Sequence, residues 1–337
     1  MFSLLRHLAI AAVAGVALFL LSGRLSQFNN LQLATMAYYF VAVAGLTVLT
    51  GSNGQISLGH GALMAVGGYT TAKLLGEDGT GPPLALVLVG AAVAGAIAGL
   101  LAGAAAARLR GPYLAGATLA LAVGLPALAL RFPGFLGGSD GLTVFPPTPP
   151  AGLGESFALE RWQACIACAA ALIAYVVLAN LERSRLGRDF RAVRDDEVAA
   201  ELAGLPVART QVLAFVVSAA CAGLGGAVLA VVVRLAAPSA FTLVLSLALL
   251  TAIVIGGLGS LLGALLGSAL LVFLPPWVTD LGTAQGLSST AAAQLAPLVY
   301  GLVLAAVMIF APAGFVGTLR RLWQTARGRW SPRAGGR

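Results

Sequence analysis

Long apolar runs alternate with short polar connections along almost the whole chain. A helix rises 1.5 Å per residue and the bilayer hydrocarbon is about 30 Å thick, so about 20 apolar residues are enough to cross it. The pattern therefore predicts an all-α polytopic membrane protein with about ten transmembrane helices. We expect them at residues 4–21, 31–50, 51–75, 84–107, 113–132, 162–181, 211–233, 241–255, 260–274 and 292–311.

The composition strengthens this prediction. Hydrophobic residues are 59% of the 337 and charged residues only 9%, against about 25% charged in soluble domains. The net charge of +8 does not indicate nucleic-acid binding, because no basic domain lies outside the apolar runs. With an N-terminus inside, fifteen Lys and Arg side chains fall on the cytoplasmic side and five outside, which predicts cytoplasmic termini. Arg110 and the arginines of the tail contribute to that count.

The predicted transmembrane permease domain covers residues 1–318, and a basic cytoplasmic tail follows at 319–337. Residues 133–160, rich in Pro and Gly, are expected to form an ordered outer cap. The first run has no small-x-small cleavage site, so we expect a retained helix. Gly256–Ser260 either bends one segment or separates spans eight and nine. Trp277 and Asp280 are assigned to the loop before the last span.

Glycines recur at every fourth position of the fourth predicted span, at Gly95, Gly99 and Gly103. This spacing puts them on one face, where the missing side chains allow another helix to approach closely. We interpret the face as a packing surface within the chain.

A charged stretch interrupts the apolar pattern at residues 182–209. It holds six of the twenty basic and six of the twelve acidic side chains of the chain. An Arg or Asp at the centre of a membrane helix costs about 2.5–3.5 kcal/mol, so this stretch is expected to lie in water. Its arginines favour the cytoplasmic side.

A short helix of two to three turns is predicted inside this loop. Asp195 or Asp196 is the candidate N-cap, Gly204 suits the C-terminal end and Pro206 prevents continuation. One small apolar face would comprise Val198, Ala199, Leu202 and Leu205. The residues alone leave open whether this helix is a solvated connector or a docking element.

Polar residues gather in the third predicted span, in the sequence GSNGQISLGHGALMAVGGY at 51–69. Polar groups and irregular backbone at membrane depth require protein or a water-filled cavity beside them. The segment is therefore predicted to line a pathway; the alternative is that the polar residues cap a helix and His60 packs with a hydrogen bond. The candidate pathway residues are Asn53, Gln55, Ser57, His60 and Tyr69.

No pattern in the sequence indicates catalysis or a bound cofactor. The outline GxxxxG at 54–59 lacks the Lys and Ser/Thr of a phosphate loop. Cys165 and Cys168 lie within an apolar run and are interpreted as packing residues. Every Asp and Glu falls in a predicted loop or at a span end, whereas an ion-coupled carrier usually keeps a carboxylate inside the membrane. A separate ATPase could then supply the energy, with the charged loop as its docking site.

Three stretches resemble the membrane permeases of branched-chain amino-acid ABC importers. The first stretch runs from Gln55 through His60 to Tyr69. The third stretch comprises Gly256, Gly257, Gly259 and Ser260. The second is the charged loop with the span after it. Its resembling residues are Arg194, Asp195, Asp196, Glu197, Ala199, Ala200 and Gly204, with Val198 where the related EAAxxxG loop has Glu.

The resemblance implies a permease subunit in the bacterial inner membrane, with the second stretch coupling it to the ATPase and the late glycines serving as hinge or packing residues. It also implies a second homologous permease, two cytoplasmic ATP-binding subunits that carry ATP and Mg²⁺, and an extracytoplasmic solute-binding protein. The implied cargo is a branched-chain or hydrophobic amino acid, while urea or a short amide remains an alternative. Two hypotheses assign the chain to another class of protein. The first is a stand-alone secondary carrier or channel, and the second is a non-transport scaffold or membrane-embedded enzyme.

Overall fold

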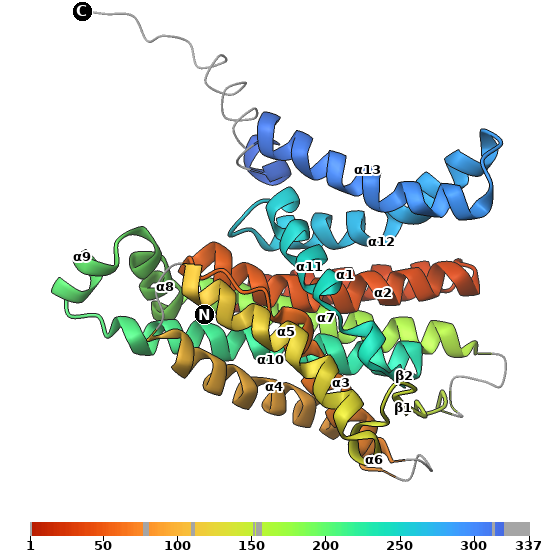
Figure 1. Cartoon of the computed structure of the whole chain (residues 1–337), viewed down its shortest axis with the longest axis horizontal. Coiled ribbons are helices and arrows are strands. Elements are labelled where there is room, and N and C mark those ends of the chain that lie inside the picture. The colour runs from red at the N-terminus through yellow and green to blue at the C-terminus, as the bar shows by residue number, and fades with distance from the viewer. Residues whose placement is uncertain are drawn as a thin grey trace, which may run out of the picture.

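The computed structural model of this protein describes residues 2–76, 81–108, 112–150, 152, 157–311 and 314–319. It is a bundle of long helices, as the apolar pattern predicts (Figure 1). The long helices are α1 (Phe2–Ser22), α2 (Gln27–Leu46), α3 (His60–Leu75), α4 (Leu84–Ala106), α5 (Pro112–Arg131), α7 (Leu159–Arg183), α10 (Val207–Val233), α11 (Leu243–Gly256), α12 (Leu261–Ala284) and α13 (Ser289–Phe310). Nine helical stretches in the described residues are long and apolar enough to cross a membrane. Helix α11 counts among them together with the residues from Pro238 that precede it, whereas α3, with 16 residues, does not.

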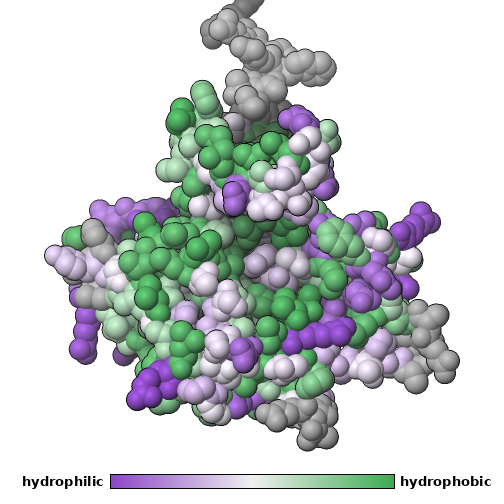
Figure 2. Space-filling model, turned by 45° about the vertical axis from the view of Figure 1, so that its right-hand side comes forward, coloured by the Kyte–Doolittle hydropathy of each residue, from purple (hydrophilic) through white to green (hydrophobic). Residues whose placement is uncertain are grey.

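The surface of the bundle suits a lipid environment. Figure 2 shows hydrophobic residues over much of the face in view, with hydrophilic residues gathered towards its margins. Helix α4 exposes Leu86, Val93 and Leu101, whereas its buried positions include the stripe of glycines. The apolar-out arrangement confirms a multi-pass membrane protein.

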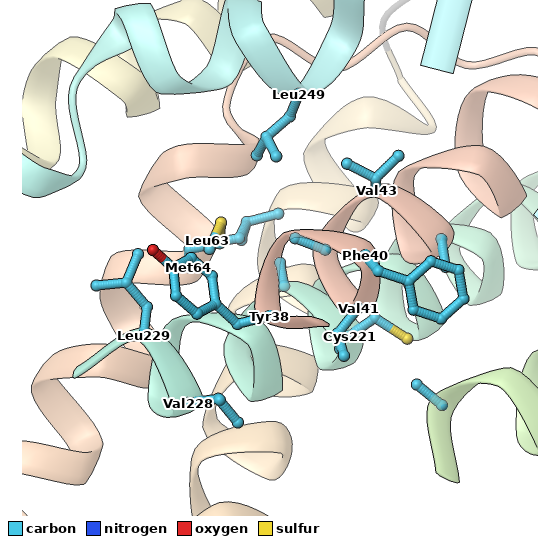
Figure 3. Packing of buried hydrophobic residues seen from close by; sticks show 14 of the residues in the cluster. Tyr38, Phe40, Val41, Val43, Leu63, Met64, Cys221, Val228, Leu229 and Leu249 are labelled. Carbon is cyan, nitrogen blue, oxygen red and sulfur yellow. The ribbon is translucent and has the colours of Figure 1, made fainter. Parts of the chain in front are cut away.

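The core forms where α2, α3, α10 and α11 meet. Tyr38 and Val41 of α2, Met64 of α3, Leu229 of α10 and Leu249 of α11 are buried in one cluster (Figure 3). Helix α7 packs along α2, and α1 packs against α7. Helix α12 contacts α2 and α11, and α13 lies against α12 at the margin of the bundle (Figure 1).

The glycine face of α4 packs against α10, as the sequence predicts. A Cβ added at Gly103 would lie 2.8 Å from Cβ of Phe215, and one added at Gly99 would collide with Ala219. Gly95 in turn lies against Gly223 of α10. Position numbers fall along α4 as they rise along α10, so the two helices are antiparallel and their backbones are in close contact.

The third predicted span, 51–75, does not form one membrane-length helix. Helix α2 continues through the π-helical turn η1 (Thr47–Ser52), so the helical segment reaches Ser52. The chain then runs without helix through 54–59 before α3 begins at His60. Gly54 has φ +81°, a conformation that glycine adopts without steric cost and that ends the turn.

The glycine sequence at Gly256–Ser260 separates two helices rather than bending one. Gly257 (φ +115°) and Gly259 (φ +76°) reverse the chain, and the Ser260 hydroxyl accepts a hydrogen bond from the Gly263 amide at 3.2 Å. The prediction that Trp277 and Asp280 lie in a loop is wrong, because α12 continues to Ala284 through two prolines. The two prolines remove the amide donors to the Leu271 and Val272 carbonyls, and such losses are tolerated in membrane helices where other groups satisfy the freed carbonyls.

The two ends of the bundle carry different small elements (Figure 1). At one end lie α6 (Pro133–Leu136) and the antiparallel pair β1 (Leu142–Thr143) and β2 (Leu235–Ala236), which tie the 133–160 loop to the end of α10. At the other end lie α8 (Arg185–Asp195) and α9 (Glu197–Leu202). The side of the membrane that each end faces remains a prediction, and Arg110 and the tail at 320–337 lie outside the described residues.

Candidate functional site

The charged loop forms two helices, so the prediction of a single short helix is corrected. Ser184 caps α8, whose Phe190 and Val193 are buried and anchor it to the bundle. Asp195 is the last residue of α8, and Asp196 caps α9 by accepting hydrogen bonds from the amides of Val198 and Ala199 at 2.9 and 3.0 Å. The sequence reasoning missed α8, although Leu186, Phe190 and Val193 recur at helical spacing among the charges.

Helix α9 presents an apolar tip to its surroundings. Val198 is 67% exposed and Leu202 85% exposed, whereas Ala200 is buried beneath them. Gly204 has φ +85°, and the amide of Leu205 donates to the Ala200 carbonyl at 3.0 Å, which ends the helix. A large exposed apolar pair in a water-facing loop is typical of a protein-binding surface.

Two contacts tie this loop to the membrane helices. The Gln211 amide of α10 donates to Glu197 Oε1 at 2.9 Å. Arg194 Nη1 donates to the carbonyl of Gly51 at 2.8 Å, and its Nε and Nη2 donate to Asp195 Oδ1 at 2.9 and 2.8 Å. Because Arg194 and Asp195 are partly exposed, their ion pair contributes little to stability, about 0–1 kcal/mol.

Gly51 brings the three sequence stretches together. A Cβ at this position would collide with the backbone nitrogen of Gly259, so the end of η1 lies directly against the turn between α11 and α12. A Cβ at Gly54 would lie 2.9 Å from Arg194 Cγ. We call residues 51–69 the broken segment, because residues 54–59 within it are not helical. The charged loop, the broken segment and the turn at Gly256–Ser260 therefore share one junction. Gly256 packs against Gly263 beside it.

The five polar residues predicted to line the pathway are all buried, although Ile56 between them is exposed. These are Asn53, Gln55, Ser57, His60 and Tyr69. Thr118 of α5 accepts a hydrogen bond from the Leu58 amide, and Ser246 of α11 accepts one from the Gly61 amide, both at 2.9 Å. Sequence reasoning missed these two hydroxyls, although a hydroxyl within an apolar run was a usable signal.

Several side chains of this segment have unpaired polar atoms. Both amide atoms of Asn53, Oε1 of Gln55 and the Tyr69 hydroxyl have no hydrogen-bond partner among the described residues. His60 Nε2 donates to the Ala42 carbonyl at 3.2 Å, while its Nδ1 is unpaired in the same part of the chain. Buried polar atoms are usually paired, so four such side chains in one short segment indicate a site that another molecule or another conformation completes.

The cysteines and acids offer no metal site in the residues described, where no three His, Cys, Asp or Glu side chains gather to hold an ion. Cys168 and Cys221 are buried among apolar neighbours, as packing residues are.

A helical bundle with an apolar surface and a charged helix pair at one end is the architecture of a multi-pass membrane protein. The chain belongs to the family described as "Branched-chain amino acid transport system / permease component", which it matches over residues 28–312.

Two curated relatives have the same printed name, "High-affinity branched-chain amino acid transport system permease protein LivM". The proteins from Salmonella typhimurium (strain LT2) and Escherichia coli (strain K12) are each 29% identical to this chain over 314 residues, covering 87% of this chain and 71% of the relative. No solved structure matches the chain.

Proposed function

We propose that this chain is the permease subunit of an ABC importer and carries branched-chain or other hydrophobic amino acids into the cytoplasm. The observation that carries the proposal is the apolar tip of α9, whose loop is joined to the broken membrane segment through Arg194 and Gly51. The names of the two relatives support the class of cargo.

The proposed coupling begins at α9. An ATP-binding subunit docks on Val198 and Leu202, with the acids Asp195, Asp196 and Glu197 and the neighbouring Ala199 at the rim of the contact. Closure of that subunit on ATP displaces α8 and α9, which share Asp196 as the C-cap of the first helix and the N-cap of the second. Ala200 and Gly204 act inside the loop, since Ala200 is buried and Gly204 ends the helix.

The movement reaches the membrane segment at the glycine junction. Arg194 holds the Gly51 carbonyl, and Gly51 lies against Gly259, so a shift of α8 moves the end of η1 relative to the α11–α12 turn. Gly256 and Gly257 belong to the same turn and are the proposed hinge and packing residues. Because glycines have no side chains that interlock, two glycine backbones in close contact can move past one another.

The proposed pathway includes the unpaired polar groups of Asn53, Gln55, His60 and Tyr69, with Ser57 beside them. These groups are buried in the conformation described, and a moving segment would expose them to the cargo. Amide, imidazole and hydroxyl groups suit the ammonium and carboxylate of an amino acid, and the apolar core suits its side chain.

The importer would contain a second homologous permease, two cytoplasmic ATP-binding subunits and an extracytoplasmic solute-binding protein, in a bacterial inner membrane. ATP and Mg²⁺ would be held by the ATP-binding subunits, and this chain would bind no cofactor.

A reconstituted complex tests the proposal through leucine uptake. We expect Leu202→Asp to abolish ATP-dependent uptake, because it places a charge in the apolar contact, without changing the amount of folded permease. Leu287→Asp is the matched control, since Leu287 is 42% exposed in the turn between α12 and α13. Undiminished uptake by Leu202→Asp would remove the docking role, and ATP-independent uptake by this chain alone in vesicles would favour a stand-alone carrier.

A further inference from the structure

A groove opens between the last turn of α4 and the first turns of α10, at the end of the bundle that carries α8 and α9. Its volume is about 450 Å³. Five of its seven lining residues are apolar and the other two are arginines. The lining is Ala104, Ala107, Arg108, Ala208, Arg209, Val212 and Leu213.

The glycine stripe of α4 creates this arrangement. Gly103 packs against Val212 and Phe215, so the antiparallel helices α4 and α10 are close together where α4 ends and α10 begins. Arg108 follows the C-cap of α4 directly, and Arg209 lies in the first turn of α10. The close approach of the two backbones therefore brings two cations from distant parts of the sequence to one groove.

Neither guanidinium is neutralised within the part of the chain that the structure describes. The one ion pair found there joins Arg194 to Asp195, outside the groove. Glu197, which lies close to the start of α10, is already bonded to the Gln211 amide. No side chain caps the N-terminus of α10, and its free amides add positive partial charge near Arg209.

The geometry points to an anionic glycerophospholipid as the occupant of this groove. Guanidinium groups bind phosphate through paired hydrogen bonds, so Arg108 and Arg209 would hold the headgroup phosphate. An acyl chain would lie along Ala104, Val212 and Leu213 and continue over the exposed apolar face of α4, where Leu100 and Leu101 are exposed.

The combination of two cations with an apolar wall selects a lipid rather than a free anion. Inorganic phosphate would use the arginines but gain nothing from the five apolar residues, whereas a zwitterionic lipid would use the wall but bring no net charge. A lipid held there would brace α4 against α10 at the base of the charged loop. The inference does not depend on the proposed transport function.

The full chain, purified in mild detergent, can be titrated with phosphatidylglycerol, phosphatidylcholine or inorganic phosphate and followed by native mass spectrometry. We expect phosphatidylglycerol to bind at least tenfold more tightly than phosphatidylcholine. Arg108→Gln and Arg209→Gln should each weaken it about fivefold. Arg185→Gln removes an exposed arginine of α8 that does not line the groove and should leave the affinity unchanged.

The lysine pair, Arg108→Lys with Arg209→Lys, keeps the charge but loses the paired hydrogen bonds, so its affinity for phosphatidylglycerol should lie between those of the wild type and of the glutamine variants. Equal binding of phosphatidylglycerol by the wild type and the glutamine variants would overturn the inference. So would displacement of phosphatidylglycerol by inorganic phosphate at equal concentration, which would assign the arginines to a free anion.

Discussion

Arg194 Nη1 lies 2.8 Å from the carbonyl oxygen of Gly51, across 143 positions of sequence. Arg194 belongs to the charged loop at the end of the bundle, and Gly51 lies in the last turn of η1, the extension of α2. Gly51 also lies against Gly259, so a movement of the loop can reach two membrane segments at once.

Replacing Arg194 tests this link. Arg194→Ala should reduce leucine uptake by the reconstituted complex at least tenfold, because the loop would no longer hold the end of η1. It should lower the free energy of unfolding by no more than about 1 kcal/mol, since the side chain is partly exposed. Arg188→Ala is the control, because among the described residues the Arg188 side chain donates only to the Arg183 carbonyl. Uptake equal to that of the control would contradict the coupling route.

Adding one methyl group at Gly51 should disrupt the glycine junction. The Cβ of Gly51→Ala would collide with the Gly259 backbone, and overpacking of this kind costs about 1–3 kcal/mol or more. Thermal unfolding in detergent measures the loss. Gly116→Ala in α5 is the matched control, since its added Cβ meets no atom within 4 Å, and it should be neutral or slightly stabilising. Equal melting temperatures for the two variants would rule out a tight junction.

The N-cap of α9 gives a local prediction. Asp196→Ala removes the acceptor for the Val198 and Ala199 amides and should destabilise α9 by about 1 kcal/mol. Asp196→Asn keeps an oxygen at the same place and should behave much like the wild type. Hydrogen exchange of those two amides is the measurement; unchanged protection in the alanine variant would mean that the cap does not hold the helix.

Removing the Tyr69 hydroxyl, which has no hydrogen-bond partner among the described residues, should affect stability and transport differently. Tyr69→Phe should leave the melting temperature unchanged or raise it, because a buried hydroxyl without a partner is lost. Leucine uptake should fall severalfold if the hydroxyl pairs with the cargo. Tyr300→Phe is the comparison: its hydroxyl accepts a hydrogen bond from Thr251 at 2.9 Å, so its loss should cost about 1 kcal/mol. A marked loss of stability in Tyr69→Phe would indicate that the hydroxyl is paired after all.

The sequence determined that this chain is a multi-pass helical membrane protein with a charged loop between two of its long helices. Apolar runs and the cost of charge in hydrocarbon are local properties, so the multi-pass fold and the water-facing loop around Arg194 followed from composition and spacing alone. The four-residue glycine period likewise predicted a packing face on α4, which lies against α10.

Only the tertiary structure decided where the helices break and which stretches meet. The sequence marked 51–75 as an irregular span but did not place its break, because hydropathy does not record the φ of +81° at Gly54 or the partners that Thr118 and Ser246 supply from other helices. The contacts of Gly51 with Arg194 and Gly259 join residues far apart in the chain. Such contacts depend on how helices cross, and helix crossing is set by the fit of whole surfaces rather than by any local pattern.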